Sequence, residues 1–361
     1  MIIILSVLTL PSCRYSQSGQ DNPFTRIEVR GLCENPEIVA TGRVSGSAHD
    51  DLILGRDSVI FVYQILRDSA QLLFTDSFDK EIHEMCIADA NNDGRNDIVL
   101  LNGWSGYKDD EVSVHLLCHK KNGWILSEVY SKSSPRPQPV YLEVNDLDGD
   151  GRDEIIASYF ESKYMVETVV LSEKSGNWST DTSYIERMAT AHDIGYLADD
   201  DPVHVVGRVY GDSIGENGDA YILKGNEQTD LDVYRGVRSA VRIGDGDNDG
   251  INEIYIGDGW HQNYGKMARA RLAVVTPEGD DYNYSLIEDI KGQTDVGQIE
   301  IADITGDGKN EVIVSGNLSV RIYKYQGDQW KVFSDTSLKS GQFVAGNITG
   351  NKKKELIIVG R

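Results

Sequence analysis

Short apolar runs, rich in valine, isoleucine and leucine, recur along the whole chain, and each run follows a polar loop. Runs of three or four such residues are typical of buried β-strands, whereas no stretch of useful length repeats its apolar residues with a helical period. The runs occupy residues 52–54, 98–100, 155–157, 203–206, 254–256, 312–314 and 356–358. The hydrophobic pattern therefore predicts an all-β chain.

The loops before these runs repeat a nine-residue pattern, whose copies begin at residues 43, 89, 146, 193, 245, 303 and 347. Neighbouring copies lie 44 to 58 residues apart, which leaves room for four short strands, named A to D in chain order. In the second repeat we expect them near 85–88, over 98–102 and 111–118, and from 124 to 130. Small repeats bury their faces against one another, and four antiparallel strands per repeat are typical of propeller blades. We therefore predict a seven-bladed β-propeller of four-stranded antiparallel blades over residues 24–361.

Closure of this ring depends on the two ends of the sequence. The sequence stops at Arg361, directly after strand B of the seventh repeat. Residues 24–30 precede the first strand A as residues 330–333 precede the seventh. We expect residues 24–30 to form the outer strand of the last blade, which lacks strand C unless residues 2–10 supply it.

Four of the loops carry oxygen-bearing side chains at positions 1, 3, 5 and 9 and a glycine at position 6. Every second side chain of an extended segment faces the same side, and glycine permits the positive φ angle of a tight turn. Ca²⁺ prefers six to eight oxygen ligands at about 2.3–2.6 Å, and the carbonyl of position 7 adds one. We predict about four structural calcium sites, with ligands at Asp89, Asn91, Asp93, Arg95, Asp97, Asp146, Asp148, Asp150, Arg152, Glu154, Asp245, Asp247, Asp249, Ile251, Glu253, Asp303, Thr305, Asp307, Lys309 and Glu311.

Two other interpretations of the acidic loops were weighed. An EF-hand requires a bidentate glutamate at position 12 and flanking helices, but position 12 is apolar in all four loops. The second alternative, that aspartate and glycine merely form hairpin turns, stays open. The copies that begin at residues 43, 193 and 347 have lost ligands, and no metal is expected there.

The DxDxDGxxD/E loop followed by an apolar strand resembles the FG-GAP/VCBS repeats of the integrin α-subunit propeller and of bacterial surface proteins. The resemblance covers nearly all of residues 24–361 and is strongest at 89–97, 146–154, 245–253 and 303–311. It implies that the loop joins the first two strands of each blade and binds Ca²⁺. It also implies adhesion or ligand binding rather than catalysis, without naming the ligand.

Charge excludes some partners. The 361 residues carry a formal net charge of −23, from 58 acidic and 35 basic residues, and four Ca²⁺ ions would offset eight of these charges. Such acidity argues against nucleic acid or an anionic membrane surface as the partner. The sequence contains no P-loop and no HExxH motif. After Cys13 is set aside, three cysteines remain without CxxC spacing, so neither a disulfide framework nor a zinc site is predicted.

Residues 1–13 are an apolar run that ends in small residues and Cys13. They resemble a bacterial lipoprotein signal, in which Cys13 would be lipidated, and the run is too short to span a bilayer. Residues 14–23 would then be a tether. The alternative is that residues 2–10 form a β-strand of a chain whose start lies upstream.

The B–C loops of the second to fifth repeats carry aromatic residues on the face opposite the acidic loops. Exposed rings beside Asp and Asn suit stacking on sugars or anchoring of a protein partner, although several of them would instead pack between blades. The candidate ligand-binding residues are Trp104, Tyr107, Tyr159, Tyr164, Tyr210, Trp260, His261 and Tyr264. We expect an exported, lipid-anchored binding module at the cell surface, without catalysis, whose ligand is a glycan or a protein. The alternative is a polysaccharide-acting hydrolase or lyase with its site among these loops.

Overall fold

The computed structural model describes most of the chain, and all statements below concern the described residues. These are residues 2–5, 29, 31–34, 36–66, 69–103, 110–135, 138–147, 149–174, 176–197, 202–209, 218–224, 227–236, 238–259, 270–279, 281–291, 295–316, 319–336, 342–350 and 354–359. Within them, no helix is long and apolar enough to cross a membrane.

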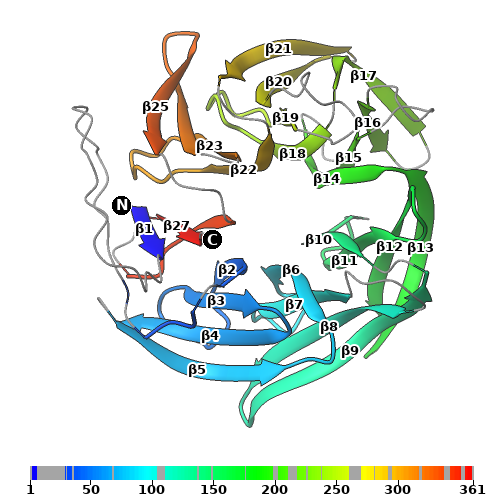
Figure 1. Cartoon of the computed structure of the whole chain (residues 1–361), viewed down its shortest axis with the longest axis vertical. Helices are drawn as coiled ribbons and strands as arrows, with labels where there is room; N and C mark the ends of the chain where they lie inside the picture. The colour runs from blue at the N-terminus through cyan, green and yellow to red at the C-terminus, as the bar shows by residue number, and fades with distance from the viewer. Residues whose placement is uncertain are drawn as a thin grey trace.

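Six four-stranded antiparallel sheets follow one another around a central axis, as expected for a β-propeller (Figure 1). In every sheet, strands that are consecutive in the sequence are hydrogen-bonded neighbours, and the first of them lies nearest the axis. Blades one to three are β2 (Ile38–Gly42), β3 (Asp51–Arg56), β4 (Val59–Leu66) and β5 (Ser69–Ser77); β6 (Glu81–Ala88), β7 (Asp97–Gly103), β8 (Asp110–Lys120) and β9 (Gly123–Ser134); and β10 (Pro139–Asn145), β11 (Glu154–Phe160), β12 (Met165–Lys174) and β13 (Asn177–Arg187).

Blades four to six repeat this order. They are β14 (Ala189–Tyr196), β15 (Pro202–Arg208), β16 (Gly218–Lys224) and β17 (Glu227–Gly236); β18 (Arg238–Gly244), β19 (Glu253–Asp258), β20 (Ala270–Glu278) and β21 (Asp281–Ile290); and β22 (Val296–Ala302), β23 (Glu311–Gly316), β24 (Val320–Tyr325) and β25 (Trp330–Thr336). The four strands predicted in the second repeat are thereby confirmed.

The prediction of seven four-stranded blades is wrong, because the seventh repeat contributes only β26 (Phe343–Gly346) and β27 (Glu355–Val359). These two strands form a three-stranded sheet with β1 (Ile2–Leu5), which pairs with β27 in parallel. The edge of β27 that does not pair with β26 is thereby covered by β1, a strand far away in the sequence. Of the predicted closing strand 24–30, only Val29 lies within the described residues.

Side chains near the axis form hydrogen bonds between several neighbouring blades. The Glu143 carboxylate on β10 accepts a hydrogen bond from the backbone N–H of Ile194 on β14, with an N···O distance of 3.1 Å. The ring closes in the same way, because the Gln342 side chain accepts the N–H of Val39 on β2, at 3.3 Å. The seventh repeat therefore joins blade one although its sheet is incomplete.

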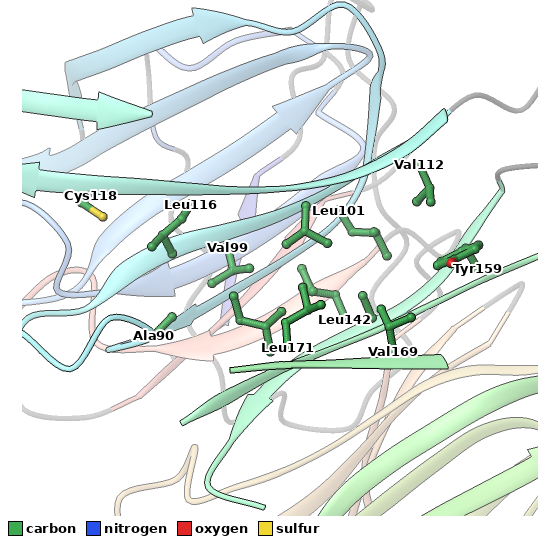
Figure 2. Packing of buried hydrophobic residues seen from close by; sticks show 13 residues of the cluster. Ala90, Val99, Leu101, Val112, Leu116, Cys118, Leu142, Tyr159, Val169 and Leu171 are labelled. Atoms are coloured by element: carbon green, nitrogen blue, oxygen red, sulfur yellow. The ribbon is translucent and has the colours of Figure 1, made fainter. Parts of the chain in front are cut away.

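Apolar side chains fill the spaces between adjacent blades, and Figure 2 shows one such cluster between blades two and three. Val99, Leu101 and Leu116 of blade two meet Leu142 and Leu171 of blade three there, and all five are buried. A sheet covered on both faces requires apolar residues in both directions along its inner strands, as the sequence pattern indicated.

A chain of buried polar groups crosses from blade three to blade four. The His192 Nε2–H donates to the Ala189 carbonyl at 2.8 Å, which leaves Nδ1 of His192 to accept from Nε2–H of His204 at 3.0 Å. Nδ1 of His204 then accepts from the Tyr184 hydroxyl. With both imidazoles neutral, this pattern assigns one tautomer to each ring. Burial lowers the pKa of His192 to about 4 and that of His204 well below its usual range.

We expect the His192 ring to stay neutral down to about pH 4. Its pKa in the folded protein lies below the value of about 6.5 in the unfolded chain, so the unfolded state binds more protons between these pH values. The stability from the neutral ring, about 3 kcal/mol, is therefore complete above pH 6.5 and lost as the pH falls towards 4. NMR titration of the histidine ring signals measures this directly, and a His192 ring that titrates near 6.5 would contradict the buried chain.

Candidate metal centres

An equivalent hydrogen bond closes each of the four intact acidic loops. In each, the backbone N–H of the glycine at position 6 donates to the aspartate at position 1. The N···Oδ2 distances are 2.8 Å in blade two, 2.9 Å in blade three, 3.1 Å in blade five and 2.8 Å in blade six. These glycines adopt φ angles of 81°, 84°, 93° and 83°. A Cβ at any of them would meet no atom within 4 Å, so the backbone angle rather than a lack of space requires glycine. The positive φ expected at Gly151 is confirmed.

The carboxylate at position 9 is buried in every copy that the structure describes at this position. It opens the second strand of its blade, and one of its oxygens accepts the backbone N–H of loop position 2, at 2.8 to 3.2 Å in five copies. The exposed fraction is at most 5% for each of these residues, which are Asp51, Asp97, Glu154, Glu253, Glu311 and Glu355. A buried charge of this kind needs partners for its second oxygen, and the copies differ in what they provide.

In blade five, the Tyr255 hydroxyl donates to Oε2 of Glu253 at 2.7 Å, and Oε1 of Glu253 receives no hydrogen bond from the described residues. Ligand oxygens of Asp245, Asp247, Asp249 and Glu253 lie within 4.8 Å of one another. Oδ1 of Asp245 and Oε1 of Glu253 are buried and have no hydrogen-bond partner among the described residues. Burial raises the pKa of Glu253 to about 7, and the neighbouring aspartates add to the effect. These unpaired, clustered oxygens fit a hard cation such as Ca²⁺.

In blade six, a lysine occupies the corresponding space. Nζ of Lys324, on β24, lies 2.8 Å from Oδ2 of Asp307 and 2.8 Å from Oε1 of Glu311. It also donates to the Thr305 hydroxyl at 3.1 Å. Burial lowers the pKa of Lys324, but the hydrogen bonds to Asp307 and Glu311 outweigh this effect and leave the pKa above its usual value. The predicted ligands Asp303, Asp307 and Glu311 are brought together, but around an ammonium group.

The loops of blades two and three are less complete. In blade two, the Asn91 amide donates to Oδ2 of Asp97 at 2.6 Å, and burial raises the pKa of Asp97 to about 6. Lys120 approaches Asp93 to 3.9 Å.

In blade three, Asp148 lies outside the described residues. Asp146 and Glu154 keep the same hydrogen bonds to their loop as the corresponding residues in blade five. The predicted ligand at position 7 of each loop is the backbone carbonyl and not the side chain. This applies to Arg95, Arg152, Ile251 and Lys309.

In the degenerate copies, groups of the same loop donate hydrogen bonds to the buried carboxylate. Asp51 accepts hydrogen bonds from the N–H of Ser45 at 2.8 Å and from the Ser45 hydroxyl at 2.9 Å. Glu355 accepts from the Thr349 hydroxyl at 2.6 Å. The copy predicted to begin at Asp193 is misplaced, because Asp193 lies inside β14 and Tyr196 already pairs with Pro202 across a shorter loop. Asp193 instead forms an ion pair with Arg242 at 3.0 Å.

Most of the candidate ligand-binding residues lie outside the described residues, as does the predicted lipidation site Cys13. They are Trp104, Tyr107, Tyr210, Trp260, His261 and Tyr264. Tyr159 is fully buried and hydrogen-bonded to Tyr130 and Glu167, so the expectation of an exposed ring is wrong at this position. Its place on an inner strand, where every side chain is covered, explains this. Tyr164 is half-buried, with the Lys163 ammonium 4.8 Å from its ring centre.

A cavity of about 570 Å³ lies on the axis, between the first strands of all seven repeats. Glu143, Arg242 and Glu300 line it, each three residues before the first position of its loop. Burial raises the pKa of Glu84, another lining residue, to about 7. The loop motif does not include these residues, although their common offset from the loops is a usable signal in the sequence. Lys324 was also missed, because it lies on a strand 13 residues beyond Glu311 and outside the loop motif.

A comparison of the sequence with models of known protein families gives no match, and a search of curated proteins finds no similar sequence.

We expect the Asp51→Ala variant to lose about 2–4 kcal/mol of unfolding free energy, because two N–H groups and two hydroxyls of its loop would lose their buried acceptor. Added calcium should not restore the loss, because this copy lacks the other carboxylates. Denaturant unfolding with and without calcium measures both effects. Asp79→Ala, at an exposed site in the next repeat, is the control and should change stability by less than about 0.5 kcal/mol.

Proposed function

We propose that this protein is an exported, calcium-stabilised β-propeller that binds a glycan or protein ligand at the cell surface without catalysis. The observation that carries the calcium proposal is the blade-five cluster, in which four carboxylates converge and two buried oxygens lack partners among the described residues. The β-propeller fold supports the role of a binding module, because a rigid ring of blades presents its loops on two faces.

Calcium explains the chemistry of the blade-five loop better than a transition metal. The cluster offers carboxylate oxygens only, without histidine or cysteine, and hard cations such as Ca²⁺ select such donors. A bound dication removes the repulsion among the four carboxylates. Because it binds the folded loop and not the unfolded chain, it raises stability by mass action. Calcium is thus structural in this proposal.

The cell-surface role rests on the sequence. The loop motif resembles FG-GAP/VCBS repeats, and we propose that the chain performs the adhesive or ligand-binding role that these repeats imply. We also propose that Cys13 carries a lipid anchor, with residues 14–23 as the tether. The strand β1 occupies part of the same segment, so cleavage before Cys13 would leave the edge of β27 open.

We expect chelation to lower the melting temperature of the wild-type protein and excess calcium to restore it. Asp247→Asn should remove most of the calcium-dependent rise, because it removes one carboxylate of the blade-five cluster. Asp281→Asn is the matched control: it makes the same charge change in the same blade, on the exposed outer strand β21, and should leave the rise intact. Equal melting curves with calcium and with chelator would show that the acidic loops are turns that bind no calcium.

We expect a glycan array or a panel of surface proteins to show binding without product release, and Trp104→Ala and Trp260→Ala to weaken that binding at least tenfold. A buried aromatic anchor at an interface contributes about 1.4 kcal/mol or more, which corresponds to that factor. Tyr159→Phe is the control, since its ring is in the core and should not touch the ligand. Release of oligosaccharide product would instead identify a polysaccharide-acting enzyme.

A further inference from the structure

We propose that Lys324 is the resident cation of the blade-six loop, so that residues 303–311 hold an ammonium group in the position where the loop motif implies a calcium ion. This inference rests on the proposed calcium function, since it assigns which of the acidic loops take metal. It departs from the sequence motif, which makes 303–311 one of the strongest copies.

The contacts of Lys324 use the oxygens that a dication would need. Its Nζ lies within 3.1 Å of Thr305, Asp307 and Glu311, which are loop positions 3, 5 and 9. The Lys324 side chain is only 12% exposed, so neighbouring residues cover most of it. An ammonium with three oxygen partners satisfies all three of its N–H donors.

The loop is then complete without metal. The second oxygen of Glu311 accepts the backbone N–H of Ile304 at 3.0 Å, and the Thr305 hydroxyl donates to the first at 3.1 Å. A Ca²⁺ ion at its usual distance of about 2.4 Å from the same oxygens would lie against the ammonium, and the two charges would repel. Metal binding therefore requires Lys324 to leave the loop.

Blade five shows what the same place holds when no lysine is present. Lys324 lies one residue beyond Tyr323, which pairs with Val312, and Thr276 lies one residue beyond Val275, which pairs with Ile254. Thr276 is thus the counterpart of Lys324. Position 3 differs as well, because Asp247 of blade five corresponds to Thr305 of blade six. With these two differences, the blade-five loop keeps oxygens without a hydrogen-bond partner among the described residues, whereas the Lys324 ammonium already offsets negative charge in the blade-six loop.

The test counts calcium ions per chain by isothermal titration calorimetry and native mass spectrometry on the full chain. In the wild-type protein, Asp303→Asn should leave the number of bound ions unchanged. The double variant Lys324→Thr with Thr305→Asp, which reproduces the blade-five residues, should bind one additional ion, and its melting temperature should become more sensitive to chelation. Lys331→Thr with Thr305→Asp, at the exposed cross-strand partner of Lys324, makes the same charge change but keeps Lys324, and should add none.

Loss of an ion in Asp303→Asn, or no additional ion in the double variant, would overturn the assignment of Lys324. Failure of the calcium function gives a different result: Asp247→Asn would then leave the ion count of the wild-type protein unchanged. The gain of an ion in the double variant remains measurable in that case, so the two proposals fail separately.

Discussion

The buried carboxylate at the start of the second strand, described in six of the seven repeats, is the constraint on which these loops depend. It ties the loop to the blade by accepting the N–H of position 2, and it is too deeply buried for water to solvate its charge. Each blade must therefore supply compensation locally. Asp51 and Glu355 receive hydroxyl donors from their own loops, and Glu311 receives a hydroxyl and an ammonium. Glu253 accepts the Tyr255 hydroxyl at one oxygen, but its other oxygen has no hydrogen-bond partner among the described residues and lies close to three aspartates. Under the proposed calcium function, blade five is therefore the copy that takes a cation from solution.

The choice between these solutions depends on two side chains, at loop position 3 and on the third strand of the blade. A serine or threonine at position 3 donates a hydrogen bond to the buried carboxylate, whereas an aspartate adds a second negative charge. Asparagine can do either, because its amide presents a donor at one end and an acceptor at the other. In blade two the Asn91 amide donates to Asp97, and its own oxygen lacks a partner among the described residues. The number of aspartates alone is thus a poor guide to metal content.

Much of the fold was predictable because its signals are local. Buried strands show as apolar runs, and the glycine at position 6 shows where φ is positive. The errors arose where distant parts of the chain decide the outcome. The sequence leaves residues 2–10 open as a source for the third strand of the last blade. Ile2–Leu5 takes that place, but no local pattern specifies its pairing with β27, which joins residues from opposite ends of the chain. Asp193 has the spacing of a loop residue, but its strand extends to Tyr196 and its partner is Arg242, 49 positions away. Lys324 reaches its loop from another strand, so no motif within the loop reveals it.

The loops also contact one another, so compensation in one blade affects its neighbours. The Asn310 side chain of blade six donates to the carbonyl of Asp245 at 2.8 Å, and the Asn252 side chain of blade five donates to the carbonyl of Tyr196 at 2.7 Å. A cation in blade five would therefore order a group of loops that extends over blades four to six. At the closure of the ring, the backbone N–H of Asn347 donates to Asp50, and the flanking loops satisfy their buried carboxylates with hydroxyl groups. The junction between the first and seventh repeats thus compensates its buried carboxylates with hydroxyl groups, whereas the proposed calcium site lies in blade five.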